Sequence, residues 1–281
     1  MAHQHYLYFK LMLRNNLLLD IDEYELVDTK DKGLVCDFMD MQLASIFQPV
    51  LRADGRVAGR EAFLRAEHGE HGALEPDHAF ERAVNVNRVV QFDRLVRIIH
   101  LVNHARSSAE TELLFLNVHP RLLNSVKDHG RTFERILHYY SVPTSKVVIE
   151  VRETENMDEA VLVEAVSNYR SLGYRIAVDN FGGAHSSLER VLKLRPDIVK
   201  LDGELIQATE HSSSATASFN QLVDRFRSTG IQVAVQGIET AKQLESAKKA
   251  GADLLQGNHL VRPEFTASKW QPSGRIRQLA A

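Results

Sequence analysis

The stretch Tyr174–Leu188, YRIAVDNFGGAHSSL, carries residue types that could do chemistry. The alternating apolar residues at its start predict a short buried strand. Asp179 and Asn180 follow at the end of this strand, before a glycine turn, and offer the oxygen atoms that a hard metal ion prefers. Ser186 and Ser187 are candidate caps for the next helix. A strand-to-helix loop whose Asp caps a helix has the same pattern, so the stretch alone leaves both interpretations open.

Polar residues recur within or directly after the other predicted strands. Together they are Glu61, Asn117, Glu150, Asp179, Lys200, Gln236 and Gln256. A single buried Glu is more often part of a structural ion pair, but seven polar groups in one place would each need a partner to offset lost hydration. Oxygen donors without cysteine favour Mg²⁺, Mn²⁺ or Ca²⁺ over zinc. His185 and His259 lie near these positions without the spacing of a zinc site, so we expect neither to be functional.

The elements that must position these residues alternate along the chain. The sequence predicts eight strands, the last six in alternation with helices: Ile46–Leu51, Val57–Arg65, Leu113–Val118, Lys146–Val151, Tyr174–Val178, Asp197–Leu201, Gln232–Val235 and Asp253–Leu255. Asp54-Gly55 is a hairpin signal that makes one strand antiparallel, and a long helix is expected over Pro76–Ala105. Such alternation implies a mainly parallel sheet. We therefore predict an α/β fold, a modified TIM-type (β/α)8 barrel with one antiparallel strand and its site at the carboxyl ends of the strands.

The barrel is predicted to span residues 45–266, between an N-terminal extension at residues 1–44 and a C-terminal tail at residues 267–281. In the extension, the apolar segment Tyr6–Leu19 precedes the charged segment Asp20–Lys32. The extension is too short to form a domain. We expect it to pack on the barrel or, alternatively, to contact a protein partner or form a homodimer, because exposed apolar patches usually mark contacts. The tail is expected to be weakly ordered.

The composition is that of an ordinary soluble protein, since the 281 residues are 44% hydrophobic and 25% charged. The net charge of -3 provides no basic field for double-stranded nucleic acid. Cys36 is the single cysteine, which excludes an internal disulfide and a thiolate metal cluster and is compatible with the reducing cytoplasm, where we expect the protein. The start, MAHQH, lacks the features of a signal peptide, and no apolar run reaches the roughly 18–20 residues of a membrane span.

Short motifs lie at the predicted strand ends, in the order Phe47-Gln48-Pro49, Glu61-Ala62-Phe63-Leu64-Arg65, Phe115-Leu116-Asn117-Val118, Ile149-Glu150-Val151-Arg152-Glu153, Asp179-Asn180-Phe181-Gly182, Val199-Lys200-Leu201-Asp202, Val235-Gln236-Gly237-Ile238-Glu239-Thr240 and Gln256-Gly257 with Pro263. Each is weak alone. Together they resemble the motifs of the EAL domain family, phosphodiesterases that hydrolyse the bacterial second messenger cyclic di-GMP. The match covers about Phe47 to Phe265, with Phe63 replacing the Leu of E-A-L-L-R and Arg152 the Thr of l-E-i-T-E. The family fold is a barrel whose first strand is antiparallel.

The resemblance implies a role for each matching residue. One divalent metal, Mg²⁺ or Mn²⁺ if any is bound, would be held by Glu61, Asn117, Glu150 and Asp179. Lys200 would position or activate the attacking water, Glu153 would brace the loop after Asp179, and the surrounding polar shell would hold Glu239 and Gln256. Cyclic di-GMP would lie against Gln48, Leu64, Arg65, Asp202 and Gln256. Arg65 is suited to a phosphate, and Phe63 could flank a guanine.

Two further departures from the family fall at the chemistry. Asn180 replaces the second Asp of D-D-F-G, and Gln236 replaces the first Glu of E-G-V-E. Asn180 removes a negative charge from the position that would bridge two metal ions, and Gln236 cannot accept a proton as a carboxylate does. Loss of a general base alone costs roughly 10²–10⁴-fold in rate. Both replacements keep the shape of the side chain, so binding could persist after the chemistry has gone.

Three functions therefore remain open. We expect a degenerate EAL-like domain that binds cyclic di-GMP with weak or no phosphodiesterase activity, because Gln48, Leu64 and Arg65 are retained while Asn180 and Gln236 depart. An active, slow, metal-dependent phosphodiesterase would need the remaining metal site to support turnover. A nucleotide-independent protein-interaction module would use the barrel surface or residues 1–44.

Overall fold

The computed structural model describes residue 14 and residues 23–109, 111–125, 130–152, 158–183 and 186–265. Glu153, His185, the C-terminal tail and most of residues 1–22 lie outside these ranges. The strands are β1 (Glu25–Thr29), β2 (Gly33–Phe38), β3 (Met41–Arg52), β4 (Val57–His68), β5 (Gly72–Leu74), β6 (Leu113–Asn117), β7 (Val147–Arg152), β8 (Arg175–Phe181), β9 (Ile198–Leu201), β10 (Gln232–Val235) and β11 (Leu254–Leu255). The helices are α2 (Pro76–Asn85), α3 (Val89–Ser107), α4 (Pro120–Ser125), α5 (Arg131–Tyr139), η2 (Thr144–Lys146), α6 (Glu159–Ser171), α7 (Leu188–Leu194), α8 (Gly203–Ala208), α9 (Ser213–Arg227) and α10 (Ala241–Lys249).

Eight strands close into a barrel in the order β3-β11-β10-β9-β8-β7-β6-β4, and β4 pairs back with β3. β3 is antiparallel to both of its barrel neighbours, β4 and β11. All the other neighbouring pairs of the barrel are parallel. The predicted (β/α)8 barrel with one antiparallel strand is thus confirmed. The β3–β4 turn lies where the sequence placed it, with Gly55 at a φ of 85° that favours glycine.

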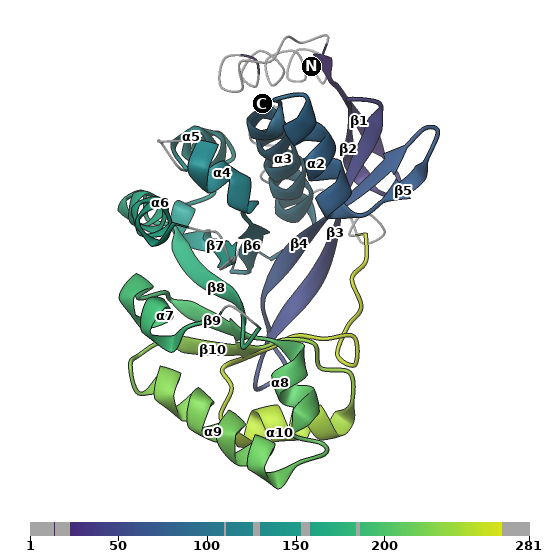
Figure 1. Ribbon diagram of the computed structural model, residues 1–281. Coiled ribbons are helices and arrows are strands. Elements are labelled where there is room, and N and C mark those ends of the chain that lie inside the picture. The colour runs from purple at the N-terminus through teal and green to yellow at the C-terminus, as the bar shows by residue number, and fades with distance from the viewer. Residues whose placement is uncertain are drawn as a thin grey trace.

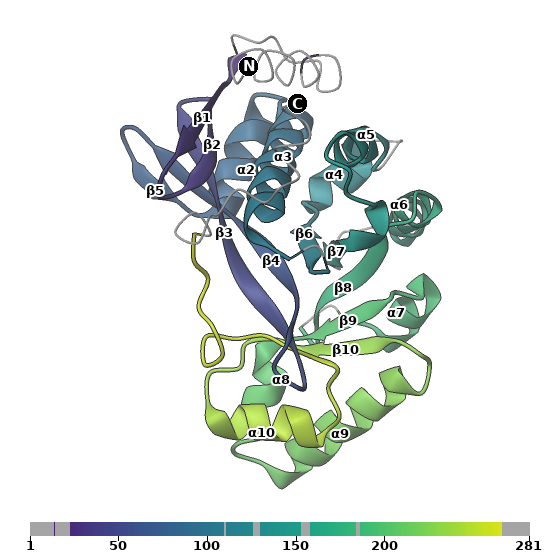
Figure 2. The ribbon, with the colours of Figure 1, turned by 180° about the vertical axis from the view of Figure 1, so that it is seen from behind.

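The first two barrel strands are longer than predicted. β3 begins at Met41 rather than Ile46, and β4 ends at His68 rather than Arg65. Their extra residues pair with β2 and β5, and β2 pairs with β1, so a five-stranded antiparallel sheet extends from the barrel. Figures 1 and 2 show this sheet beside α2 and α3, at the opposite end of the molecule from α9 and α10. Residues 25–44, which were predicted to be part of an extension, therefore form strands that continue the barrel sheet.

A buried asparagine joins this antiparallel sheet to α3. Asn103 Oδ1 accepts a hydrogen bond of 2.8 Å from the backbone N–H of Leu34, and Asn103 Nδ2 donates one of 2.8 Å to the carbonyl of Leu34. The amide side chain therefore pairs with both backbone groups of a β2 residue, as a neighbouring strand would. One turn earlier on α3, His100 Nδ1 lies 2.7 Å from Ser45 Oγ of β3.

The helix predicted from Pro76 to Ala105 is in fact two helices, α2 and α3. Pro76 lies in the first turn of α2 as expected. Asn87, between the two helices, has a φ of 60°. This left-handed conformation cannot continue an α-helix, and Asn adopts it more readily than most residues. Within the described ranges, no helix has the length and apolar character that crossing a membrane requires.

A layer of apolar side chains fills the barrel below the site. Every barrel strand contributes to it: Val50, Ala58, Leu113, Phe115, Val148, Ala177, Ile198, Ala234 and Leu254. Side chains alternate between the two faces of a strand, so the residue two positions away also points into the barrel. The residues two positions beyond this layer, toward the carboxyl ends of the parallel strands, therefore meet inside the barrel mouth.

Candidate functional site

The polar residues predicted at the strand ends are brought together above the apolar layer. They come from all eight barrel strands: Gln48 from β3, Glu61 from β4, Asn117 from β6, Glu150 from β7, Asp179 from β8, Lys200 from β9, and Gln236 and Gln256 directly after β10 and β11. Glu61, Glu150, Asp179, Lys200 and Gln256 are buried. We call this group the barrel mouth.

Lys200 lies at the centre of the barrel mouth. Its Nζ is 2.6 Å from Glu61 Oε2, 2.7 Å from Glu150 Oε1 and 3.6 Å from Asp179 Oδ1. Burial alone would lower the pKa of Lys200, but the three surrounding carboxylates raise it above its usual value. The side chain therefore stays protonated, and it can position a water molecule or stabilise negative charge but cannot take up a proton.

The two buried glutamates differ in their affinity for protons. Burial and the negative charge of Glu61 raise the pKa of Glu150 well above its usual value. Burial would also raise the pKa of Glu61, but the ammonium of Lys200 holds it below its usual value. Glu61 is therefore the ionised partner of Lys200. Glu150 is the glutamate that holds a proton more readily, although its Oε1 lies 2.7 Å from Lys200 Nζ.

Amide side chains direct their N–H groups at Glu61. Gln256 Nε2 donates to Glu61 Oε2 at 2.8 Å and to Gln48 Oε1 at 3.2 Å. Asn117 Nδ2 donates to Glu61 Oε1 at 2.9 Å. Gln48 Nε2 in turn donates to the carbonyl of Val261 at 3.0 Å. Both oxygens of Glu61 thus accept hydrogen bonds, one of them from the Nδ2 of Asn117.

Arg152 is an additional cation of the barrel mouth, and it reaches Asp179 across two neighbouring strands. The register of β7 and β8 pairs these two residues. Arg152 Nη2 donates a hydrogen bond of 3.0 Å to Asp179 Oδ2. The Asp179 side chain is 5% exposed, whereas that of Arg152 is 56% exposed. The carboxylates of Glu61, Glu150 and Asp179 are therefore compensated by two cations, Lys200 and Arg152.

A bulge in β8 turns two consecutive residues toward the barrel mouth. The pairing with β9 shifts between Val178 and Phe181, and Asn180 between them has a φ of 60°. Bulges of this kind re-aim side chains, and Asn tolerates the left-handed conformation. Gln236 Nε2 donates a hydrogen bond of 3.3 Å to Asn180 Oδ1. The amide side chains of Asn180 and Gln236 are therefore hydrogen-bonded to each other.

A pocket of about 260 Å³ opens at the barrel mouth and is lined by Gln48, Glu61, Phe63, Arg152, Asp179, Gly203, Gln236, Gly237, Glu239, Gln256, Gly257 and Asn258. Seven of these were predicted as site residues. Sequence reasoning missed the pocket positions of Arg152 and Asn258, and Asn258 has no signal of its own beyond its place after Gln256-Gly257. Backbone forms part of the wall, because a Cβ on Gly237 would lie 2.9 Å from the Cα of Gly203.

Other predicted residues do not line this pocket. Leu64 is buried in the apolar core, because it points to the opposite face of β4 from Phe63 and Arg65. Arg65 itself is exposed on β4. Asp202 caps α8 by accepting a hydrogen bond of 2.7 Å from the backbone N–H of Glu204. The roles assigned to these residues by resemblance stay predictions.

Glu239 and His259 lie at the edge of the barrel mouth. Glu239 Oε1 accepts a hydrogen bond of 3.0 Å from Asn258 Nδ2. His259 is exposed, and its backbone N–H donates to the carbonyl of Ile238 at 3.0 Å. Ser187 caps α7 by accepting from the backbone N–H of Arg190 at 3.4 Å, as the sequence indicated.

The donor set of the barrel mouth does not fit a divalent metal ion in this arrangement. Among the residues that the structure describes, no group of three or more His, Cys, Asp or Glu side chains is placed to hold one. Lys200 lies against one oxygen of each of the three carboxylates, and Arg152 holds the second oxygen of Asp179. These two cations compensate the charges that a metal ion would otherwise neutralise. The expectation of Mg²⁺ or Mn²⁺ therefore has no support in the geometry.

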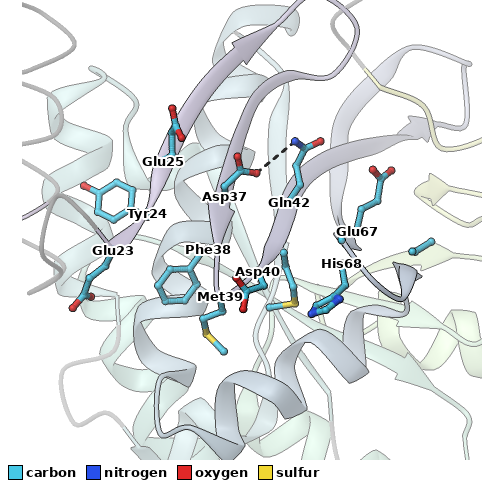
Figure 3. Close-up of a pocket in the computed structure, with 14 residues that line it drawn as sticks. Glu23, Tyr24, Glu25, Asp37, Phe38, Met39, Asp40, Gln42, Glu67 and His68 are labelled. Atoms are coloured by element: carbon cyan, nitrogen blue, oxygen red, sulfur yellow. Dashed lines mark hydrogen bonds between the residues drawn. The ribbon is translucent and has the colours of Figure 1, made fainter.

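A larger pocket, of about 920 Å³, lies away from the barrel mouth on the antiparallel sheet (Figure 3). Its lining is mainly acidic and apolar: Glu23, Tyr24, Glu25, Asp37, Phe38, Met39, Asp40, Met41, Gln42, Glu67, His68, Gly69, Gly72 and Ala73. Asp37 Oδ1 accepts a hydrogen bond of 3.5 Å from Gln42 Nε2. Size alone does not make this pocket the functional site, because none of the predicted site residues lies there. The smaller pocket is therefore the candidate functional site.

Comparisons with known proteins agree with the motifs at the barrel mouth. Residues 37–263 match the model of the EAL domain. The bifunctional diguanylate cyclase/cyclic di-GMP phosphodiesterase MucR of Pseudomonas aeruginosa is 30% identical over 236 residues, which are 79% of this chain and 33% of MucR. The chain thus spans about a third of the length of that relative.

Solved structures have the same barrel. A structure of the PaMucR phosphodiesterase with c-di-GMP has a TM-score of 0.69 at 25% identity and covers 79% of this chain and 92% of its own. A standalone EAL protein from Vibrio cholerae O395, bound to c-di-GMP, has a TM-score of 0.69 at 25% identity, with coverage of 81% and 94%. Klebsiella pneumoniae BlrP1, as a manganese and c-di-GMP complex, shares the fold at a TM-score of 0.72 and 22% identity, with coverage of 93% and 66%. The chain belongs to the EAL domain family.

Proposed function

We propose that this protein binds cyclic di-GMP at the barrel mouth and hydrolyses it slowly or not at all. The hydrogen bond of 3.3 Å between Gln236 and Asn180 carries the proposal. By the family resemblance, carboxylates at these two positions would take part in binding a second metal ion. The two amides carry no charge and satisfy each other, and a neutral amide oxygen is a weaker ligand for a hard cation than a carboxylate.

The charge states of Lys200 and Gln236 also support weak hydrolysis. Cleavage of a phosphodiester by water needs a base or a metal ion to activate the water. Lys200 is held protonated, Gln236 is neutral, and Asp179 is paired with Arg152. Lys200 and Gln236 are therefore poor acceptors for the proton of an attacking water molecule.

The lining of the pocket supports nucleotide binding. Phe63 presents an aromatic ring there, and stacking of a base on such a ring contributes about 1–3 kcal/mol. A pocket of about 260 Å³ is smaller than the roughly 300–1,000 Å³ of typical small-molecule sites, so it would hold part of the dinucleotide. The remainder would extend over the rim, where Arg65 is exposed. The similar PaMucR and Vibrio cholerae proteins are both described as c-di-GMP complexes.

Two measurements on one sample test the proposal. Cyclic di-GMP is titrated into the protein in a calorimeter, and the mixture is then assayed for the linear dinucleotide in the presence of Mg²⁺ or Mn²⁺. We expect saturable binding and turnover far below about 1 s⁻¹, the lower end of ordinary enzyme rates. Turnover at or above that rate would identify an active phosphodiesterase. No heat at high micromolar nucleotide, with or without a divalent ion, would favour the protein-interaction module.

A further inference from the structure

Arg152 is a residue of the barrel mouth that the family resemblance leaves without a role. It stands at the end of β7, where the resemblance expects a small neutral Thr. Its guanidinium contacts Asp179 at 3.0 Å. The side chain nevertheless remains 56% exposed, and it lines the pocket. One residue thus joins a buried carboxylate to the open pocket.

The contact places Asp179 between two cations. Lys200 Nζ lies 3.6 Å from Asp179 Oδ1, and Arg152 Nη2 lies 3.0 Å from Asp179 Oδ2. A divalent cation bound to Asp179 would have to approach these same two oxygen atoms. Repulsion between like charges is strong at such short range in a partly buried site. Arg152 therefore disfavours a metal ion and supplies a positive charge at the same carboxylate.

Most of the hydrogen-bonding capacity of Arg152 remains available for a ligand. A guanidinium has five N–H donors, and within the described residues the one hydrogen bond it makes is that to Asp179. The planar fork of the guanidinium matches two oxygens of a phosphate group. An anionic nucleotide that entered the pocket would meet this fork before it met the buried carboxylates.

We infer that Arg152 takes the place of a divalent cation at the barrel mouth: it neutralises Asp179 on one side and donates to a phosphate of cyclic di-GMP on the other, so that the nucleotide binds without metal. The phosphate contact rests on the proposed function, whereas the exclusion of metal does not. The contrasting interpretation is a purely structural ion pair between Arg152 and Asp179, whose removal would change neither metal nor nucleotide binding.

Three variants separate these interpretations. Arg152→Thr removes the charge and restores the residue type of the family motif, and Arg152→Lys keeps the charge but removes the fork. The matched control is Arg175→Thr, because Arg175 is an exposed arginine at the opposite end of β8 from Asp179. Thermal unfolding checks that each variant is folded, which we expect because both arginines are exposed.

The first measurement is a titration with Mn²⁺ alone. Loss of Arg152 frees Asp179 Oδ2, the oxygen of this carboxylate that does not face Lys200. We expect Arg152→Thr to bind Mn²⁺ at least about tenfold more tightly than wild type, because a positive charge that repels the metal ion at short range has been removed. Arg152→Lys and Arg175→Thr should bind Mn²⁺ as wild type does. Equal Mn²⁺ affinity of wild type and Arg152→Thr would overturn the inference.

The second measurement is a titration with cyclic di-GMP in EDTA and again in Mn²⁺. Wild type and Arg175→Thr should bind equally in the two buffers. Arg152→Thr should bind about 10–100-fold more weakly in EDTA, as expected for loss of a hydrogen bond to a charged group, and Mn²⁺ should restore part of the affinity. The inference is wrong if wild type needs Mn²⁺ to bind cyclic di-GMP. It is also wrong if Arg152→Thr binds cyclic di-GMP in EDTA as tightly as wild type does. If wild type binds no nucleotide in either buffer, the proposed function and the phosphate contact both fail, and the Mn²⁺ titration still decides whether Arg152 excludes metal.

Discussion

Gln236 Nε2 lies 3.3 Å from Asn180 Oδ1 and donates a hydrogen bond to it. If only one of the two amides became a carboxylate, the remaining amide could still donate to it. If both became carboxylates, two acceptors would face each other, and only a cation between them would relieve their repulsion. The two amides are therefore coupled, and the pair is stable without metal in a way that two carboxylates would not be.

The first prediction follows from this coupling. Asn180→Asp combined with Gln236→Glu should raise the rate of linear dinucleotide release in Mn²⁺ by more than the product of the two single effects, because only the double variant completes a second metal site. Without metal, the double variant should unfold more easily than either single variant. The measurement is a double-mutant cycle on turnover, with chromatographic detection of the product. A double variant no faster than the better single variant would show that the two positions do not form one metal site.

The second prediction concerns the ammonium at the centre of the barrel mouth. Lys200→Met would leave Glu61 without its 2.6 Å partner in a buried site, and removal of one member of a buried ion pair costs about 3–5 kcal/mol in the free energy of unfolding. The control is Lys193→Met, because Lys193 is 54% exposed and pairs with Glu159 at 3.3 Å. That solvent-screened pair should contribute little to stability, so Lys193→Met should change the free energy of unfolding far less than Lys200→Met does. Urea denaturation measures both, and similar losses in the two variants would contradict the prediction.

The sequence predicted that the polar residues would meet at one end of the barrel, because side chains alternate between the two faces of each strand. Ile198 belongs to the apolar layer of the barrel, and Lys200, two residues later, lies in the barrel mouth. Val148 and Glu150 repeat this relationship on β7. In a barrel of eight strands, the carboxyl ends of the parallel strands lie together at one face. Alternation would also have placed Leu64 on the face opposite to Phe63, where the structure has it in the core.

The contacts that distinguish this site could not be predicted in the same way. The Arg152–Asp179 contact depends on the register of β7 against β8. Buried parallel strands read as continuous apolar runs, which leave the register open. The sequence did not indicate β1 and β2, because the residues before Met41 contain no turn dipeptide as clear as Asp54-Gly55. β2 also packs against α3, which is distant in sequence.

The third prediction tests how the antiparallel sheet is held to α3. Asn103→Ala would leave the backbone N–H and carbonyl of Leu34 without their 2.8 Å partners. Each buried group left unsatisfied costs about 1–3 kcal/mol, so the free energy of unfolding should fall markedly. Hydrogen exchange at the Leu34 amide should accelerate at the same time. Asn85→Ala is the control, because Asn85 is exposed at the end of α2, and it should change stability by about 0.5 kcal/mol or less. Unchanged hydrogen exchange at the Leu34 amide in Asn103→Ala would show that the two hydrogen bonds from Asn103 do not hold β2 to α3.

The fourth prediction is a loss of stability in mild acid caused by two histidines of α3. Burial, reinforced by Arg97, lowers the pKa of His100 to about 3. Burial, reinforced by Arg60, lowers the pKa of His104 to about 3. In the unfolded chain each would titrate near about 6.5, so between these values the unfolded state binds more protons. Their contribution to stability is therefore complete above about pH 6.5 and is lost as the pH falls toward 3.

Between pH 7 and pH 5 this difference amounts to about 2 kcal/mol of unfolding free energy for each histidine. His100→Gln keeps a hydrogen-bonding group near Ser45, 2.7 Å from the present ring nitrogen, but does not titrate. The variant should therefore lose about 2 kcal/mol less than wild type over that pH range, whatever its stability at pH 7. His138→Gln changes an exposed histidine of α5 and should leave the pH dependence as it is in wild type. Denaturant unfolding at several pH values measures all three proteins, and a His100→Gln curve parallel to that of wild type would mean that His100 takes up its proton in the folded state as readily as in the unfolded chain.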